Sequence, residues 1–384
     1  MSVSEQQIAT VRRQLRAAMP VARKWAYFDH AAVAPIPTPA VEVLEKWLRE
    51  VAEEGDTVGG NWARQLAGTR AAAAELIGAA EVEIALVPNT TAGINLVAEG
   101  FPWQSGDNVV TLDDEFPANV YPWLNLERRG VETRRVPTVD GRVDLDRLAE
   151  HCDARTRVVS VSWVGYANGC RRDLGAIADI AHRQGAIFLV DAIQGLGVFP
   201  LNVAEANVDC LSADGHKWLL GPEGAGIAYV SRACLDRLRP IGVGWNSVVH
   251  ANDYSRIELK LKPSAARYEG GTHNMAGFLA LGACLRLLLS LGVENLAAAI
   301  LDFTDRAAVR LKELGAVVHS PWQPAERSGI VSFELPGRDP MALRKHCLTR
   351  QVVLNCRAGR LRISPHAYND EHDIERLIDA LRSA

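Results

Sequence analysis

The sequence predicts an α/β protein built around a mainly parallel sheet with helices on its faces. Between about Glu83 and Ser231, short apolar runs alternate with amphipathic stretches such as Leu174–Gly185. Strands that alternate with helices form parallel sheets, and ligands bind such sheets at the carboxyl ends of the strands. The strand-like runs are Ile84–Val87, Val109–Leu112, Val158–Val161, Ile187–Val190, Val208–Ala213 and Ile227–Val230.

The length of 384 residues favours a large domain and a smaller one over a single core. We expect an N-terminal helical segment over residues 1–25, a large α/β domain over 26–260 and a small α+β domain over 261–384. The last of these should contain two long helices, strand-like runs at Gly329–Leu335 and Val352–Asn355, and a final helix from about Glu371.

The composition argues against several kinds of partner. Hydrophobic residues make up 48% of the chain and charged residues 23%, and the formal net charge of −4 is small for this length. No run of basic residues appears, so we expect neither nucleic acid nor an anionic membrane as a partner. The most apolar stretch, Met275–Leu291, is interrupted by Arg286 and predicts a buried helix instead of a membrane span.

The N-terminal residues and the cysteines predict a cytoplasmic protein. Glu5, Arg12 and Arg13 precede any apolar run, which is unlike a secretory signal. The seven cysteines are scattered and odd in number, and their spacing matches neither a metal site nor a redox pair. They predict reduced thiols.

A candidate acid, Asp191, ends a continuous apolar run, and Gln194 follows three residues later. A carboxylate at a buried strand end needs a partner, because an isolated buried charge is costly. A pyridinium nitrogen would be such a partner, and Gln194 would then be placed to donate to a neighbouring phenolate oxygen. The alternative is an aspartate that caps the following turn, which is a common role at strand ends.

A candidate amine, Lys217, follows the run Val208–Ala213 and precedes an apolar pair and a glycine-rich turn that ends at Gly226. Enclosure of this kind lowers the proton affinity of a lysine, as Schiff-base chemistry requires. The glycines would let the backbone pass close to a ligand. The alternative is a surface lysine beside an ordinary turn.

Two further segments follow strands. Pro88–Asn95 opens a helix and offers Thr90, Thr91 and free backbone N–H groups at the positive helix end, which suits a phosphate. Threonine and asparagine are also ordinary helix caps. In Asp114–Asn119, Phe116 has the shape to stack on a flat heteroaromatic ring, although a single phenylalanine more often belongs to a core.

Together these four places predict a binding site for pyridoxal phosphate. They supply a phosphate cradle, a stacking ring, an acid for a ring nitrogen and an amine for an aldehyde. These are the groups that this cofactor requires from a protein. Lys217 would hold the cofactor as a Schiff base.

With these residues the chain resembles the class V aminotransferase family of fold-type I enzymes, which includes cysteine desulfurases and isopenicillin-N-epimerase-like proteins. The resemblance runs from Tyr27-Phe-Asp-His-Ala-Ala to Leu361-Arg-Ile-Ser-Pro-His-Ala-Tyr-Asn. It implies cofactor contacts by Lys217 at the aldehyde, Asp191 at the pyridinium nitrogen, Gln194 near the ring oxygen, Thr90 and Thr91 at the phosphate, and His216 beside the ring.

Three cofactor-site residues depart from the pattern of the family. Phe116 stands where many relatives have a stacking histidine, so the ring platform is kept without a titratable nitrogen. Tyr166 stands where desulfurases usually have an asparagine near the ring oxygen. Asp214 stands where they often have a serine, and a carboxylate does not match the phosphate contact expected there.

The resemblance also implies a homodimer and a substrate site. The segment Arg267–Asn274 looks like the one that reaches into the neighbouring subunit, where Thr272 would complete the partner's phosphate site. Arg362 matches the arginine that binds a substrate carboxylate, a task suited to a bidentate guanidinium. A surface ion pair is the alternative for Arg362. His30 is a candidate substrate contact, with a structural histidine as its alternative.

We expect an enzyme that acts on a small amino acid or amine, with Lys217 as the base that removes the α-proton. Desulfurases carry a persulfide-forming cysteine on a loop well ahead of the arginine, whereas Cys356 lies only six positions before Arg362, at the end of a predicted strand. Transamination is therefore favoured. The leading alternative is a C–S lyase or desulfurase-like elimination, and an epimerase comes third. A silent cofactor-binding scaffold belongs to a different class, and retention of the site residues argues against it.

Overall fold

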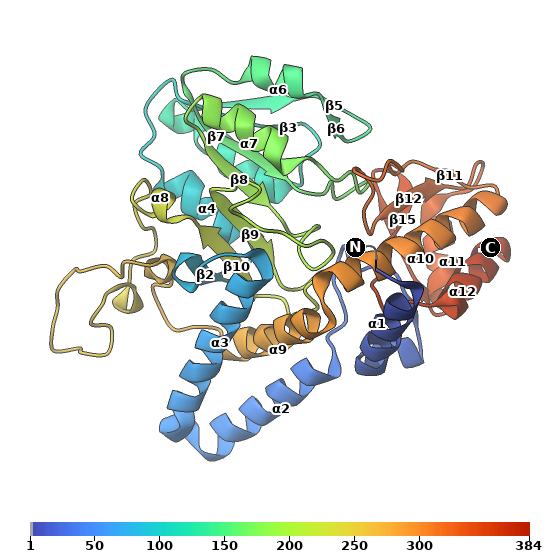
Figure 1. The fold of residues 1–384 in the computed structure, drawn as a ribbon, viewed down its shortest axis with the longest axis horizontal. Helices are drawn as coiled ribbons and strands as arrows, with labels where there is room; N and C mark the ends of the chain where they lie inside the picture. Colours follow the sequence, from blue (N-terminus) through green and yellow to red (C-terminus); the bar gives the residue numbers. More distant parts are fainter. Residues whose placement is uncertain (1–2) are drawn as a thin grey trace.

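The computed structural model describes residues 3–384, and its centre is a seven-stranded sheet (Figure 1). The strand order is β2-β10-β9-β8-β7-β3-β4. Only β10 runs antiparallel to its neighbours, so the predicted mainly parallel α/β sheet is confirmed. The strands are β2 (Ile84–Val87), β3 (Asn108–Leu112), β4 (Glu132–Val136), β7 (Thr156–Ser162), β8 (Ile187–Asp191), β9 (Cys210–Asp214) and β10 (Gly226–Val230).

Apolar side chains cover both faces of this sheet, because successive residues of a strand point to opposite sides. Ile84 of β2 belongs to the core on one face, with helices α3, α7 and α9, and Ala85 belongs to the core on the other, with α4. The helices of this region are α2 (Thr38–Glu53), α3 (Gly59–Ile77), α4 (Thr90–Gly100), α5 (Tyr121–Leu124), α6 (Leu145–His151), α7 (Leu174–Arg183), α8 (Arg232–Leu235) and α9 (Met275–Leu291), and a short hairpin joins β5 (Thr138–Val139) to β6 (Arg142–Val143).

A four-stranded antiparallel sheet forms a second core on the right of Figure 1. Phe28 packs there against Phe303, so the chain just after the first helix contributes to this core. The elements are α10 (Val293–Glu313), β11 (Val317–Val318), β12 (Val331–Glu334), α11 (Pro340–Thr349), β14 (Asn355–Arg357), β15 (Arg360–Ile363) and α12 (Glu371–Arg382). The division of the chain at residues 25 and 260 stays a prediction.

The predicted strand Val352–Asn355 is wrong in one respect, because the chain changes partners at Leu354. Residues before it form β13 (Val352–Val353), which pairs in parallel with β1 (Ala26–Tyr27). Residues after it form β14, which pairs with β15 across a two-residue turn. Both turn residues, Ala358 and Gly359, have positive φ values of 49° and 74°, as a tight hairpin turn requires.

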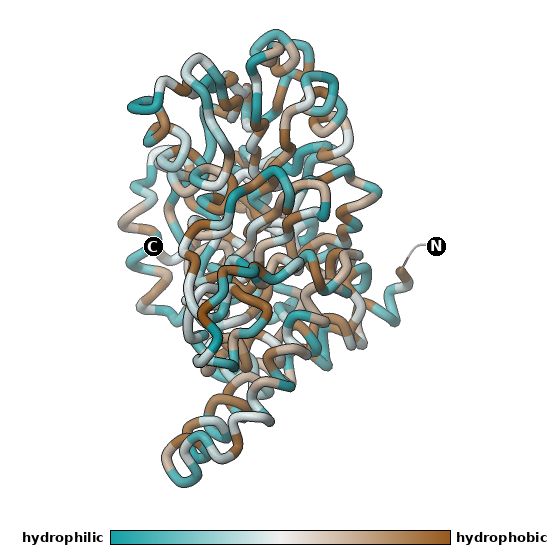
Figure 2. The backbone as a smooth tube through the Cα atoms, turned by 90° about the vertical axis from the view of Figure 1, so that its left-hand side faces the viewer, coloured by the Kyte–Doolittle hydropathy of each residue, from teal (hydrophilic) through white to brown (hydrophobic). Residues whose placement is uncertain are grey.

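Helix α1 (Glu5–Ala18) and the α2–α3 hairpin extend beyond the two sheets. Helix α1 begins at a Ser4 capping box and packs on α10. Helices α2 and α3 form a hairpin that extends from the body, seen at the bottom of Figure 2, and α9 packs against both. Within residues 3–384 no single helix is long and apolar enough to cross a membrane, and only α9 and α10 together, bent by 82°, pass that test.

Gly93 lets α4 approach the sheet closely enough to bring its first turn to the strand ends. A Cβ atom at this position would lie 2.1 Å from Ser212 Oγ and 2.7 Å from Ser212 Cβ, on β9. Any larger residue would therefore push the helix away from the sheet.

Glu269 is a buried carboxylate that ties three segments of the large-sheet region together. Its Oε1 accepts from Arg70 Nη1 at 2.6 Å and from the Leu86 N–H at 2.9 Å, and its Oε2 lies 2.6 Å from His273 Nε2. Burial raises the pKa of Glu269, but hydrogen bonds from His273 and Arg70 outweigh burial and lower the pKa to about 2. The segment after Arg267 is thereby anchored to α3 and β2.

Replacing Glu269 with Gln should destabilise the protein by about 3 kcal/mol, because the substitution leaves the Arg70 charge without its partner. The contribution also depends on pH. The folded-state pKa of Glu269 is depressed below its ordinary value of 4.5, so the stabilisation is present above that pH and is lost as the pH falls towards about 2. Urea unfolding of both proteins should show the difference shrinking between about pH 5 and about pH 3.

The matched control is Glu258→Gln, which removes a half-exposed carboxylate that pairs with Arg256. Exposed pairs contribute little, so this variant should unfold as the wild type does. Equal stability of E269Q and E258Q at neutral pH would contradict the structural role of Glu269.

Candidate active site

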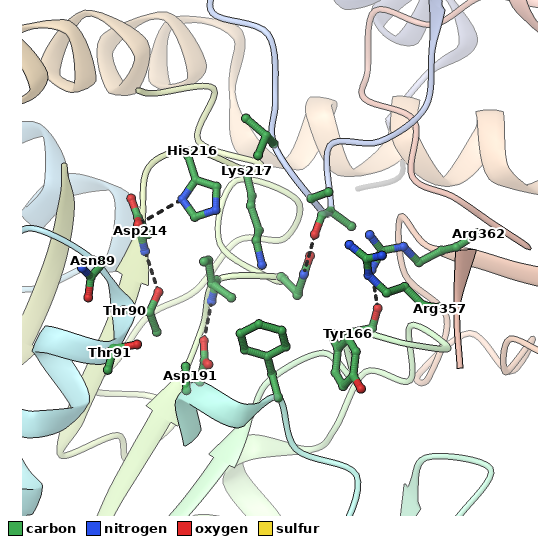
Figure 3. Close-up of a pocket in the computed structure, with 17 residues that line it drawn as sticks. Asn89, Thr90, Thr91, Tyr166, Asp191, Asp214, His216, Lys217, Arg357 and Arg362 are labelled. Carbon is green, nitrogen blue, oxygen red and sulfur yellow. Dashed lines mark hydrogen bonds and ion pairs between the residues drawn. The ribbon is translucent and has the colours of Figure 1, made fainter. Parts of the chain in front are cut away.

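A cavity of about 290 Å³ lies at the carboxyl ends of β8 and β9, beside the β14–β15 hairpin (Figure 3). The first turn of α4 closes one end of the cavity and the hairpin closes the other. Of the residues predicted for the site, the cavity brings together Thr90, Thr91, Phe116, Tyr166, Asp191, Gln194, Asp214, His216, Lys217 and Arg362.

Lys217 follows β9 and points into the middle of the cavity (Figure 3). The residue is only 8% exposed, which excludes the surface-lysine interpretation. Burial lowers the pKa of Lys217 to about 8, although the nearby Asp191 charge favours the ammonium form. Its Nζ lies 5.5 Å from the centre of the Phe116 ring. A neutral amine is therefore available near neutral pH, and a neutral amine is the nucleophilic form.

Asp191 is the last residue of β8 and is 2% exposed. Burial raises its pKa to about 7; the charge of Glu115 adds to this effect and that of Lys217 opposes it. One oxygen, Oδ1, accepts from the Ile193 N–H at 3.1 Å. Within residues 3–384 no cationic side chain forms an ion pair with Asp191. A buried carboxylate in this position fits a protonated ring nitrogen as its missing partner.

A buried ion network that sequence reasoning missed supports the end of β7 next to Asp191. Glu115 accepts from the Ser162 N–H at 2.7 Å and from Arg172 Nη1 at 3.2 Å, and it also contacts the Ser162 hydroxyl. Arg172 holds both oxygens of Asp114, at 2.7 and 2.9 Å. Since Ser162 is paired with Asp191 across the sheet, the network fixes the strand end where Asp191 sits. The adjacent acids Asp114 and Glu115, just after the predicted strand Val109–Leu112, could have indicated such a network.

The first turn of α4 forms the end of the cavity suited to an anion. The Asn89 side chain caps the helix by accepting from the Ala92 N–H at 2.9 Å. Thr90 Oγ1 accepts from the Asp214 N–H at 3.0 Å, which leaves the hydroxyl proton of Thr90 free to donate. Thr91 lines the same end. Hydroxyls at a positive helix end suit a phosphate.

The carboxylate of Asp214 is the feature of this end that suits a phosphate least. Its Oδ2 lies 3.0 Å from His216 Nδ1, and its buried Oδ1 has no hydrogen-bond partner in the described chain. A carboxylate repels a nearby phosphate unless a cation balances it, and the imidazole of His216 is the group in contact with Asp214. A phosphate contact by Asp214 stays a prediction.

Gln194 and the two aromatic residues line the middle of the cavity. Gln194 Nε2 donates to the Ala31 carbonyl at 3.0 Å, and its Oε1 accepts from Trp218 Nε1 at 2.8 Å. Phe116 and Tyr166 pack edge to face, with ring centres 5.3 Å apart at 74°. Phe116 is 42% exposed, so it is not a core residue and its ring remains free to cover a ligand.

Two guanidinium groups lie at the hairpin end of the cavity (Figure 3). Arg362 is 1% exposed, which excludes the surface ion pair. Its Nη1 donates to the Tyr166 carbonyl at 2.6 Å and its Nη2 lies 3.3 Å from Asp29 Oδ1. Burial lowers the pKa of Arg362 to about 10, while Asp29 raises it. Sequence reasoning missed Arg357. The hairpin could have indicated it, because residues two apart on a strand point to the same face. Arg357 lies two residues after Asn355, which pairs with Arg362.

Three other residues lie outside the cavity in this chain. Thr272 is exposed and does not line it. His30 is fully buried, with its ring nitrogens 2.8 Å from the Ser364 carbonyl and 3.0 Å from the Tyr368 hydroxyl. Its position matches the structural-histidine alternative, because both nitrogens already have partners. Cys356 pairs with Leu361 and points to the face of the hairpin opposite Arg357.

The comparisons with known proteins agree with this geometry. The model of the aminotransferase class V family matches residues 26–377. A probable cysteine desulfurase from Methanothermobacter thermautotrophicus is 30% identical over an alignment of 391 positions that covers 96% of this chain and 96% of its own. A cysteine desulfurase from Cronobacter sakazakii is 31% identical and is aligned over 93% of this chain and 92% of its own.

Solved structures show the same fold. The apo cysteine desulfurase from Thermococcus onnurineus has a TM-score of 0.88 at 25% identity, over 100% of this chain and 99% of its own. The cystine C–S lyase C-DES, in complex with its reaction product cysteine persulfide, has a TM-score of 0.87 at 25% identity, over 93% and 97%. A lysine-to-alanine variant of C-DES, with glycine covalently linked to its pyridoxal phosphate, has a TM-score of 0.89 at 25% identity, over 95% and 98%.

The residues of the cavity fit the same cofactor. The unpaired carboxylate of Asp191, the desolvated amine of Lys217 and the hydroxyls at the start of α4 match the ring nitrogen, the aldehyde and the phosphate of pyridoxal phosphate. Which atom of the cofactor each of these residues contacts stays a prediction. The chain belongs to the class V aminotransferase family of enzymes, and its cofactor is pyridoxal phosphate.

Proposed function

We propose that this enzyme is a C–S lyase, which removes a sulfur substituent from the β-carbon of a cysteine-type amino acid. The names of its relatives support elimination over the transamination that the sequence favours. The sequence argument against a desulfurase was the missing cysteine loop. A lyase of the C-DES type would need no such cysteine. The reaction product named for C-DES is cysteine persulfide, which itself carries the sulfur.

The observation that carries this proposal is the absence of a cysteine from the cavity wall within residues 3–384. The turn between β14 and β15 consists of only two residues, so this hairpin has no loop that could carry a cysteine to the substrate. Cys356 points away from the cavity. Sulfur would therefore leave with the product instead of being transferred to a thiol of this chain.

The side chains of the cavity divide the chemical work among them. Arg362 binds the substrate carboxylate and so orients the α-carbon toward Lys217. Burial keeps Lys217 able to accept the α-proton near neutral pH. Asp191 keeps a proton on the ring nitrogen, and the bound cofactor then withdraws electrons from the α-carbon.

The bond changes of the elimination balance with water as the only further reactant. The α-proton goes to Lys217, and its electron pair forms a double bond between the α- and β-carbons. The bond between the β-carbon and sulfur breaks with its pair on sulfur, which leaves as a thiolate or persulfide. The remaining enamine hydrolyses to pyruvate and ammonia.

We also propose that the active enzyme is a homodimer in which Thr272 completes the partner's phosphate site. A long segment, residues 245–260, projects to the left in Figure 1 and supports this assembly. We call it the projecting segment. It exposes large apolar side chains that a monomer would leave in water, at Trp245, Tyr254, Ile257 and Leu259.

The reaction is tested by incubating the holoenzyme with L-cystine in the absence of any keto acid. A lyase should form pyruvate in large excess over enzyme, while the visible absorbance of the cofactor returns after the substrate is consumed. Stoichiometric conversion of the cofactor to its pyridoxamine form, reversed only by a keto acid, would establish transamination and overturn the proposal.

Replacing Cys356 with Ala should leave the rate of sulfur release within about twofold of wild type, because the thiol does not face the substrate. The measurement is release of pyruvate and reducible sulfur from L-cystine under saturating cofactor. The control is Cys356→Ser, which keeps a polar group of similar size. Loss of sulfur release in both variants, with cofactor absorbance intact, would identify Cys356 as an acceptor.

Replacing Lys217 with Ala should abolish covalent attachment of the cofactor, because no other amine lines the cavity among the described residues. Borohydride reduction followed by intact-mass measurement detects the attachment. Lys260→Ala, which changes an exposed lysine of the projecting segment, should be modified as the wild type is. Cofactor that is still fixed to K217A would show that another lysine carries it.

A further inference from the structure

Gln194 is held from two sides by partners of opposite character. The indole Nε1–H of Trp218 donates to Gln194 Oε1 at 2.8 Å, and Gln194 Nε2 donates to the Ala31 carbonyl at 3.0 Å. An indole N–H can only donate, and a backbone carbonyl can only accept. Only one of the two possible orientations of the amide satisfies both partners, because a rotation by half a turn would place donor against donor and acceptor against acceptor.

This orientation decides which atom the amide offers to a ligand. The Nε2 group of Gln194 carries two hydrogens, and the Ala31 carbonyl takes one of them. Gln194 is 3% exposed and lines the cavity, so the second hydrogen is the group left to contact what binds there. The amide oxygen is occupied by Trp218.

Trp218 is itself held without freedom to move. It is fully buried, and a Cβ atom at Gly329 would lie 2.6 Å from its Cη2 atom. Its carbonyl lies 3.2 Å from His366 Nε2, and a Cβ atom at Gly197 would come within 2.6 Å of the same carbonyl oxygen. The indole is therefore closely packed on these sides, and its N–H points at Gln194 in a fixed direction.

The second partner of the amide is fixed as well. The Ala31 N–H donates to Ser364 Oγ at 3.0 Å, so the chain around Ala31 is pinned to the segment after β15. Both ends of the amide thus have anchors from distant parts of the chain. No sequence neighbour of Gln194 supplies either of them.

We propose that Trp218 is a positioning residue that fixes the amide of Gln194 as a hydrogen-bond donor to the ring oxygen of pyridoxal phosphate. In the opposite orientation the amide oxygen would face the negative ring oxygen and repel it. The inference concerns the bound cofactor alone, and it holds whether the enzyme performs elimination or transamination.

A donor at the ring oxygen has a measurable consequence. It stabilises negative charge on that oxygen, so the oxygen holds less tightly the proton on the nitrogen that joins Lys217 to the cofactor. The donor therefore lowers the pH at which that nitrogen loses its proton. This deprotonation changes the visible absorbance of the bound cofactor, and its midpoint is obtained by a pH titration without substrate.

The test compares Trp218→Phe and Gln194→Met with the wild type, all loaded with pyridoxal phosphate. W218F keeps an aromatic ring but removes the N–H together with part of the indole, so the midpoint should rise by up to about one pH unit as the amide loses its fixed orientation. Q194M removes the donor and should raise the midpoint at least as far. The double variant should match Q194M, because Trp218 acts only through Gln194.

Trp62→Phe is the matched control, since it removes an indole N–H that donates to Glu50 at 2.7 Å in the α2–α3 hairpin. Its midpoint should equal that of the wild type. A W218F midpoint equal to wild type, no shift in Q194M, or additive shifts in the double variant would each overturn the proposal. If W218F does not fold, Gly329→Ala presses a methyl group onto the indole and should raise the midpoint, whereas an unchanged midpoint would overturn it.

Discussion

The site depends on the exclusion of water from the place where Asp191 and Lys217 face each other. Burial raises the pKa of Asp191 to about 7 and lowers that of Lys217 to about 8, so both groups are drawn toward their neutral forms. Neither group forms an ion pair within residues 3–384, and the Ile193 N–H that donates to Asp191 does not outweigh the effect of burial. A ligand with a basic ring nitrogen and an aldehyde satisfies both at once, because the nitrogen supplies a cation to the carboxylate and the aldehyde consumes the amine. The pKa shifts of Asp191 and Lys217 therefore match the two groups of the cofactor that these residues would contact.

The surrounding structure holds these two groups in place. Apolar residues on both faces of the sheet bury the strand ends, and Gly93 allows α4 to place its first turn against β9. The network of Glu115 and Arg172 fixes the end of β7 beside Asp191. The β14–β15 hairpin supplies the arginines that close the other end of the cavity.

Sequence patterns predicted the parts of the fold that depend on continuous burial. The central strands are apolar on both faces and stand out as runs, whereas β4 is an edge strand with polar, partly exposed side chains and gives no such run. The carboxyl ends of the strands located Asp191, Lys217 and Thr90, since Asp191 ends its strand and the other two lie within three residues of theirs. Glu115, Arg357 and Trp218 were missed, because their roles depend on contacts between segments far apart in the chain. His30 lies within a recognisable motif but packs behind the cavity.

The proposed elimination rests on what the described residues of the cavity wall lack as well as on what they hold. A short hairpin without a cysteine at the cavity wall fits a lyase whose sulfur departs with the product, which accounts for both the desulfurase relatives and the missing loop.

The central claim, that Asp191 and Lys217 together hold the cofactor, is tested most directly by a crystal structure of the loaded enzyme. The account predicts continuous electron density from Lys217 Nζ to the cofactor, with the ring nitrogen in hydrogen-bond contact with Asp191. Cofactor joined to another lysine, or a ring nitrogen turned away from Asp191, would contradict it.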